Sequence, residues 1–155
     1  MPTPLNWPLI PDAQVPAGTA PLPGASDADR LLGLDVSTFP DLDATFALIS
    51  GAKVVAEAVA RRITTPRGSL RGQPDYGIDV RDYLNEGLTP ARVFALKAAI
   101  QAEAEADPRV ASVDVDVTHD PKAGSLRVSV AGVSSLGPFE LVLAITAVSV
   151  EVLSR

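Results

Sequence analysis

The sequence predicts an α+β protein: a small antiparallel or mixed sheet with about three helices, preceded by an extended proline-rich arm. Three observations support this fold class. Residues 1–34 contain half of the chain's 14 prolines. The middle of the chain places apolar residues at helical spacing. The last third alternates apolar and polar residues with a period of two, which is typical of half-buried strands. We therefore expect an arm over 1–34 and one domain over 35–155.

The composition limits the classes of partner. The chain has 155 residues, of which 46% are hydrophobic, so it can bury a core. The net charge of −6 argues against nucleic acid or an anionic membrane as a partner, because both require clustered basic residues. The absence of cysteine excludes disulfides and thiolate metal sites. No secretory signal or membrane-spanning apolar run is apparent, which favours a soluble protein made in the cytoplasm.

The arm over 1–34 contains Trp7, the only tryptophan of the chain. Proline disfavours helices and central strands, so an extended or polyproline-like conformation is expected here. Two interpretations remain open. The arm folds back onto its own domain, or it orders on a partner with Trp7 as the aromatic anchor.

The elements that follow are predicted from apolar spacing and capping residues. We expect a short strand over Thr45–Ile49, and a helix over Gly51–Ile63 with Ser50 as its N-cap. In that helix Glu57 is expected to face water. A second short helix follows, with Asp79 as a possible cap and Gly87 at its end.

The third helix begins at Thr89 and Pro90, a capping hydroxyl followed by proline at the first helical position. Its apolar face is expected to hold Val93, Leu96, Ile100 and Ala104. Pro108 ends the helix, because proline cannot sit inside one.

The last third predicts a C-terminal β-hairpin plus a long last strand. Val113, Val115 and Val117 share one face of the first segment. After a turn at residues 119–124, Leu126, Val128 and Val130 form the matching apolar face of the second segment. The last apolar segment, residues 137–153, changes phase after Thr146. We infer either a bulge near Thr146 and Ala147 or one strand that serves two partners. Residues 148–153 would then form an apolar edge, which invites pairing with another chain.

Catalytic chemistry is not expected. His119, the only histidine, is predicted to lie on a surface turn without a nucleophile or ligands at suitable spacing. The loop over residues 64–79 lacks the pattern of a phosphate loop. Asp75 and Asp79 could form a carboxylate pair, but an acidic chain offers such pairs by chance. We therefore predict no catalytic residue, no metal and no cofactor.

Three segments occur in one characteristic order: RRITTPRGSL, QPDYGIDVRDYL and EADPRVASVDVDV. Over residues 44–153 this order resembles the baseplate wedge and sheath-initiator family of contractile phage tails and related injection systems, often labelled lysozyme-like or W-like. The resemblance implies an α+β fold and a structural role that joins the wedge and tube to the first sheath ring.

The resemblance also assigns roles to residues. Asp107, Pro108 and Arg109 fall on the family's Glu-Pro-Arg signature, which docks on the helical bundle of the wedge. Asp in place of Glu keeps the charge but shortens its reach, and Arg109 is expected to bind a carboxylate of the partner. The strand that pairs with sheath subunits would hold Val148, Val150 and Val152.

Two further signatures are expected only to set the shape of a loop. One falls on Thr65, Pro66, Arg67 and Gly68. The other falls on Asp75, Tyr76 and Gly77. Gly68 and Gly77 can supply positive φ angles, and Tyr76 can attach the loop to the core.

The implied partners are wedge proteins, sheath subunits and tube or hub proteins, with six copies around the tail axis. The protein would reside in the baseplate of a virion or injection particle. Two other functions remain open. One is a small muramidase that uses Asp75, Asp79 or Glu86, and the other is an adaptor that leaves the finished particle.

Overall fold

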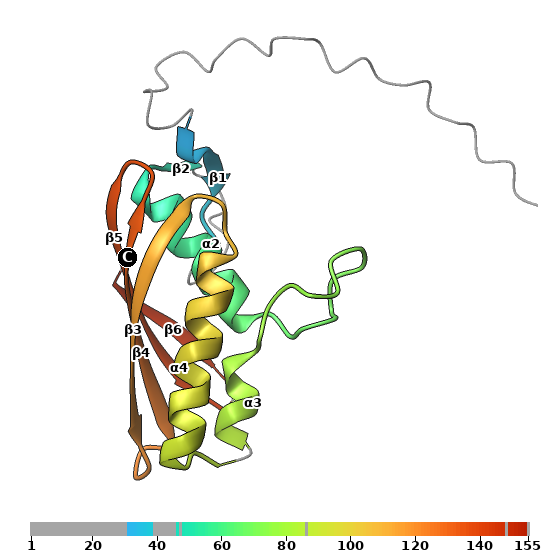
Figure 1. The fold of residues 1–155 in the computed structure, drawn as a ribbon, viewed down its shortest axis with the longest axis vertical. Helices are drawn as coiled ribbons and strands as arrows, with labels where there is room; N and C mark the ends of the chain where they lie inside the picture. The colour runs from blue at the N-terminus through green and yellow to red at the C-terminus, as the bar shows by residue number, and fades with distance from the viewer. Residues whose placement is uncertain (1–30, 39–45, 47, 86, 148, 155) are drawn as a thin grey trace, which may run out of the picture.

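The computed structural model describes residues 31–38, 46, 48–85, 87–147 and 149–154. They form an α+β fold with a two-stranded and a four-stranded antiparallel sheet, which confirms the predicted fold class. Helices lie on one side of the larger sheet, and the smaller sheet lies at one end of the molecule (Figure 1). Residues 1–30 of the arm, with Trp7, and the single positions Glu86 and Val148 lie outside the described residues.

The smaller sheet pairs β1 (Leu34–Val36) with β2 (Leu48–Ser50). Of the predicted strand over 45–49, Leu48 and Ile49 lie in β2, while positions 45 and 47 lie outside the described residues. Ser50 is the last residue of β2 rather than a helix cap. Gly51 takes the N-cap position of helix α2 (Ala52–Thr64), with φ 65 and no side-chain cap. Glycine suits this position because it adopts positive φ without strain.

Helix α2 buries both apolar and charged side chains. Val55, Val59 and Ile63 are fully buried, as the helical spacing predicts. The prediction for Glu57 was wrong, because its exposed fraction is 0%. Its carboxylate accepts hydrogen bonds from the Ser37 hydroxyl and the Thr38 amide, each at 3.0 Å. These bonds compensate the burial of Glu57 and attach the segment after β1 to α2.

Helices α3 (Val80–Asn85) and α4 (Pro90–Glu105) complete the helical layer. Thr89 caps α4 as predicted, because its hydroxyl accepts the Arg92 amide. Gly87 has φ 83 in the connection. On α4, Leu96 and Ile100 are fully buried, and the helix ends before Pro108 as predicted.

The predicted hairpin is present as β3 (Val110–Asp120) and β4 (Ser125–Ser134). Val113, Val117 and the three apolar residues of β4 are buried, as the alternation predicts. His119 lies in β3 opposite Leu126, so its assignment to a turn was wrong. Pro121 and Gly124 indicate a turn, but the strands remain paired as far as Asp120 and Ser125, so His119 still belongs to the strand.

The last apolar segment is two strands rather than one. The chain reverses between β5 (Gly137–Thr146) and β6 (Val150–Ser154), which pair antiparallel. In the turn, the Thr146 amide donates to the Ser149 carbonyl at 2.8 Å. The reversal explains the phase change after Thr146, and the register shift lies opposite Val142 and Leu143 rather than at Thr146.

The core lies between the helical layer and the inner face of the larger sheet. Its most buried strand residues are Leu126, Val128, Val130, Leu141, Leu143 and Ile145. Leu32 belongs to this core and Leu34 to β1, so the prediction that both belong to the arm was wrong. None of the described helices is long and apolar enough to cross a membrane.

Candidate docking surfaces

The turn after α4 is built around the ion pair between Asp107 and Arg109. One Asp107 oxygen accepts the Arg109 amide at 3.0 Å and the Nε atom at 2.9 Å. The other oxygen accepts Nη2 at 2.7 Å. Arg109 Nη1 donates to the Leu32 carbonyl at 3.1 Å. The guanidinium therefore closes the connection from α4 to β3 and attaches the beginning of the described chain.

Asp107 is charged in this turn although it is buried. Burial acts to raise the pKa of Asp107, but the hydrogen bonds and the positive charge of Arg109 outweigh it and lower the pKa. The Arg109 side chain keeps an exposed fraction of 28%, and Pro108 is exposed. Arg109 Nε and Nη2 already donate to Asp107. The exposed surface of this turn is therefore the outer side of the guanidinium and the Pro108 ring.

A second buried carboxylate, Glu103, organises the loop after α2. Its exposed fraction is 5%, and it accepts three hydrogen bonds. Arg62 Nη1 donates at 2.8 Å, Arg67 Nη2 at 3.0 Å and the Gly77 amide at 2.9 Å. Charge-assisted bonds of this kind are stronger than neutral ones. Glu103 therefore joins both ends of the loop to α4.

Glu103 was not among the functional residues predicted from the sequence. Its position, three residues after the buried Ile100, places it on the inner side of α4, and this spacing was the available signal. The partner Arg62 lies 41 positions away in the sequence. A local pattern therefore could not have identified the pair.

The loop residues predicted to set a shape are held by further contacts. The Tyr76 ring lies 4.5 Å from the Arg62 guanidinium carbon and is partly buried. Gly68 has φ 80 and Gly77 has φ 88. A Cβ atom on Gly77 would lie 2.2 Å from the Thr65 carbonyl oxygen, so only glycine fits there.

The remaining loop residues differ in exposure. The Thr65 hydroxyl donates to the Arg61 carbonyl at 2.7 Å, and the Pro66 carbonyl accepts the Ser69 amide at 3.1 Å. Asp75 is exposed. In Figure 1 this loop projects from the body of the molecule next to α3 and α4. Its base is thus fixed while its tip is exposed.

The loop base and the turn after α4 form one continuous site. Glu103 and Asp107 are four positions apart at the end of α4. Arg62, which binds Glu103, also contributes its positive charge to lowering the pKa of Asp107. The structure therefore brings together two signatures that lie some thirty to forty positions apart in the sequence. We call this surface the α4-end site: Arg62, Arg67, Tyr76, Glu103, Asp107 and Arg109.

The edge formed by β6 lies apart from the α4-end site. In the four-stranded sheet β3 and β6 are the edge strands, and within the described chain β6 is hydrogen-bonded only to β5. Val150 and Val152 are partly buried against the core, whereas Leu153 is 49% exposed. The opposite edge strand, β3, carries aspartates at positions 114, 116 and 120. Charges protect an edge from pairing, so β6 is the more receptive edge.

Asp75 and Asp79, two of the carboxylates considered for hydrolysis, have different surroundings, and the third, Glu86, lies outside the described residues. Both Asp79 oxygens accept hydrogen bonds from Arg81, at 2.7 and 2.9 Å. Asp75 lies in the shallow hollow beside Arg62 and Tyr76. In the part of the chain that the structure describes, no cluster of His, Asp and Glu side chains could hold a metal ion.

No protein-family model matches this chain, and no curated protein matches it. The geometry of the α4-end site and of the β6 edge therefore carries the functional argument.

Proposed function

We propose that this protein is a structural component of a contractile-tail baseplate. It would join the wedge and tube to the first sheath ring and initiate sheath assembly by strand pairing. The observation that carries the proposal is the β6 edge, an apolar strand with one hydrogen-bonded neighbour among the described residues. The order of the three sequence segments that resemble sheath initiators supports the same function.

Strand addition at β6 would use backbone groups for affinity and side chains for selectivity. The side of β6 away from β5 offers N–H and C=O groups to an incoming strand. Val150 and Val152 lie toward the core, while Glu151 and Leu153 are exposed. A sheath strand would therefore be selected by its fit to Glu151 and Leu153, rather than by the predicted valines.

The α4-end site supports docking on the wedge. Its projecting loop and exposed Pro108 lie around a set of fixed charges, and fixed geometry lowers the entropy lost on binding. The outer side of Arg109 would contact the wedge bundle, while its inner side stays on Asp107. In this proposal the ion pair orients the arginine instead of leaving it free for a carboxylate of the partner.

The first test replaces Leu153 by lysine, because a cation on an edge strand opposes pairing. Purified sheath subunits are mixed with the native protein or with a variant, and sheath formation is followed by sedimentation and electron microscopy. We expect Leu153→Lys to fold normally and to lose most sheath nucleation. A matched control is Phe94→Lys, because Phe94 is 76% exposed on α4, which packs on the opposite edge strand. Normal nucleation by Leu153→Lys would refute pairing at β6.

Two further measurements separate the other functions from this one. Clearing of a peptidoglycan suspension by the native protein would favour a muramidase. Purified particles can be examined by mass spectrometry. Absence of the protein from them would favour an adaptor that leaves after assembly. A strain without the gene should yield naked tubes or no tails if the protein initiates the sheath.

A further inference from the structure

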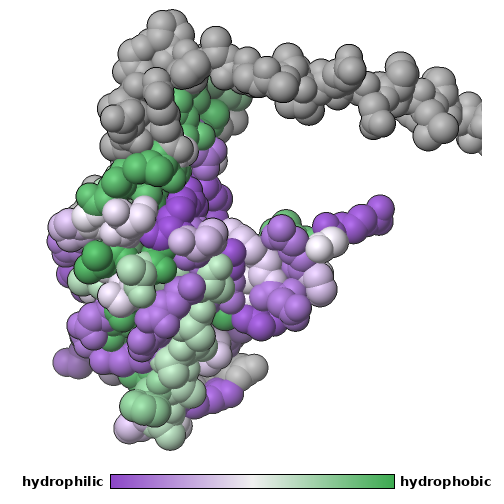
Figure 2. All heavy atoms as spheres, turned by 45° about the horizontal axis from the view of Figure 1, so that its top comes forward, coloured by the Kyte–Doolittle hydropathy of each residue, from purple (hydrophilic) through white to green (hydrophobic). Residues whose placement is uncertain are grey.

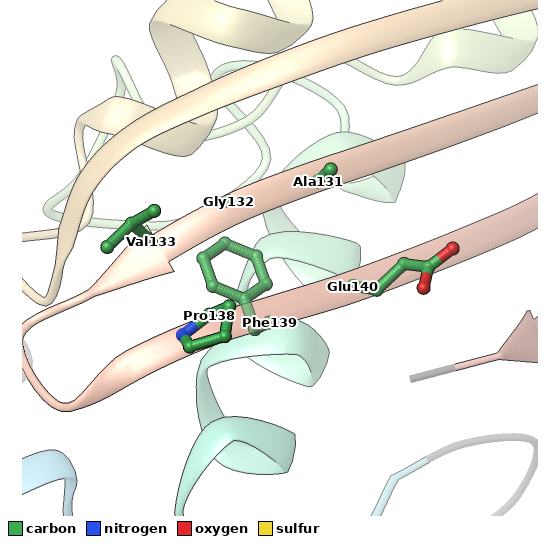
Figure 3. Close-up of a pocket in the computed structure, with 6 residues that line it drawn as sticks. All are labelled: Ala131, Gly132, Val133, Pro138, Phe139 and Glu140. Atoms are coloured by element: carbon green, nitrogen blue, oxygen red, sulfur yellow. The ribbon is translucent and has the colours of Figure 1, made fainter.

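An apolar hollow of about 530 Å³ lies on the β4–β5 hairpin, at the end of the molecule where the described chain begins. Figure 3 shows its six lining residues, which we call the hairpin hollow: Ala131, Gly132, Val133, Pro138, Phe139 and Glu140. Val133 and Pro138 face each other across the strands, as do Ala131 and Glu140. Val133 is 48% exposed although it is a large apolar residue. The hollow therefore offers apolar surface that is available for a ligand.

The hollow lies over a part of the sheet with little side-chain bulk. Ala131 is exposed like Val133 and adds only a methyl group to the outer face of β4. Gly132 between them is buried, and the Phe139 ring fills the space that a Cβ atom on Gly132 would need. Ala131 therefore leaves the outer surface low beside Val133 and Glu140. A single Glu140 carboxylate at the rim supplies a hydrogen-bond acceptor.

The first buried residue of the described chain lies directly beside this hollow. Leu32 lines a second, smaller hollow of about 170 Å³ together with Leu136, and Pro138 lines both hollows. Leu31 and Leu136 are exposed apolar residues at the same end. Figure 2, in which the upper end of Figure 1 comes forward, shows hydrophobic surface around this end. The preceding 30 residues are therefore attached at the margin of the apolar surface.

The composition of those residues matches the hollow. Leu5, Trp7, Leu9 and Ile10 form an apolar group between prolines. A tryptophan side chain buries on the order of 200 Å² and carries one N–H donor, so it suits an apolar hollow with an acceptor at its rim. The 24 positions from Trp7 to Leu31 can extend to roughly 80 Å, so distance does not restrict docking. Tethering gives an effective concentration on the order of millimolar, so a weak contact suffices.

We propose that the proline-rich arm docks on its own domain, with Trp7 in the hairpin hollow and its indole N–H directed to Glu140. This inference does not depend on the proposed function. It decides between the two interpretations of the arm in favour of docking in cis. A neighbouring copy and a different protein are the competing occupants.

The single tryptophan makes the proposal directly measurable. Fluorescence of the full chain is excited where Tyr76 and Tyr83 do not absorb, and the synthetic peptide of residues 1–30 serves as the exposed reference. We expect a blue-shifted emission and a severalfold lower acrylamide quenching constant in the full chain. Val133→Lys should return both values to those of the peptide. Phe94→Lys, the matched change on α4, should leave them unchanged.

The alternatives give distinct results. Emission of the native chain equal to that of the peptide would overturn the proposal. A blue shift that Val133→Lys does not remove would place Trp7 elsewhere and would also overturn it. A blue shift that disappears on dilution would show docking between copies rather than in cis. Circular dichroism of both variants checks that each is folded, and Glu140→Gln, which keeps the shape, should give a smaller red shift than Val133→Lys.

Discussion

Replacement of Glu103 by glutamine tests whether a buried ion cluster fixes the loop base. Gln keeps the size of Glu but removes its charge and places an amide NH₂ group among donors. The native carboxylate is 5% exposed and accepts three bonds, from Arg62, Arg67 and the Gly77 amide. Since all three partners are donors, they cannot rearrange to satisfy the new NH₂ group.

The magnitude follows from the exposure of each partner. Removal of one member of a buried ion pair costs about 3–5 kcal/mol. Arg62 is mostly buried, so its bond carries most of this effect, whereas Arg67 is about half exposed and contributes at most about 1 kcal/mol. We expect Glu103→Gln to lower the free energy of unfolding by about 3 kcal/mol. For a domain of this size, that corresponds to a Tm lower by roughly 10 °C.

Urea unfolding followed by far-UV circular dichroism measures the loss, and hydrogen exchange at the Gly77 amide reports the loop itself. The matched control is Glu105→Gln, the same change two positions along α4 on an exposed glutamate that accepts one bond from Gln101. The control should change stability by less than about 0.5 kcal/mol. An equal effect of both variants, or unchanged exchange at Gly77, would refute the assignment of Glu103 as the organising group.

Two other predictions concern the same end of α4. Gly77→Ala should destabilise by about 1–3 kcal/mol from strained backbone, with a further loss from the clash with Thr65. Gly72→Ala, which has a similar φ and open space, should show only the strain in urea unfolding; equal losses would contradict the clash. The folded-state pKa of Asp107 lies below its ordinary value, so its stabilisation is present above about pH 4 and is lost as the pH falls through the folded pKa. Asp107→Asn should be less stable than the native protein by roughly 2 kcal/mol at neutral pH, and the difference should narrow in acid; a constant difference between pH 7 and pH 3 would exclude this linkage.

The parts of the fold that follow from local signals could be predicted from the sequence. Thr89 and Pro90 start α4 because one hydroxyl and one fixed φ are sufficient for a helix start. The alternation of β3 and β4 predicts their hairpin because each inward residue meets an inward residue of the partner strand. These signals need no knowledge of distant residues.

Other features depend on contacts that a local pattern does not contain. The turn between β5 and β6 has no Gly, Pro, Asn or Asp, so the usual turn signal is absent, and the hydroxyl groups of Thr146 and Ser149 stabilise it instead. Only the phase change marked the reversal. Glu57 was expected to face water because it lies off the apolar stripe of its helix, whereas Ser37 and Thr38, which bind it, lie about twenty positions earlier.

Three of the buried carboxylates, on α2, on α4 and in the turn after α4, have a common physical role. Glu57 joins the segment after β1 to α2, and Glu103 joins the projecting loop to α4. Asp107 accepts from Arg109, which in turn donates to the Leu32 carbonyl. In each case an irregular segment is held by a charge-assisted bond to a helix or its end rather than by apolar packing. Burial of unpaired charge is costly, so each segment has one favoured arrangement in which its carboxylate is satisfied. The consequence is that a loop with few apolar residues keeps a defined shape, which a docking surface requires if binding is not to be weakened by the entropy of ordering.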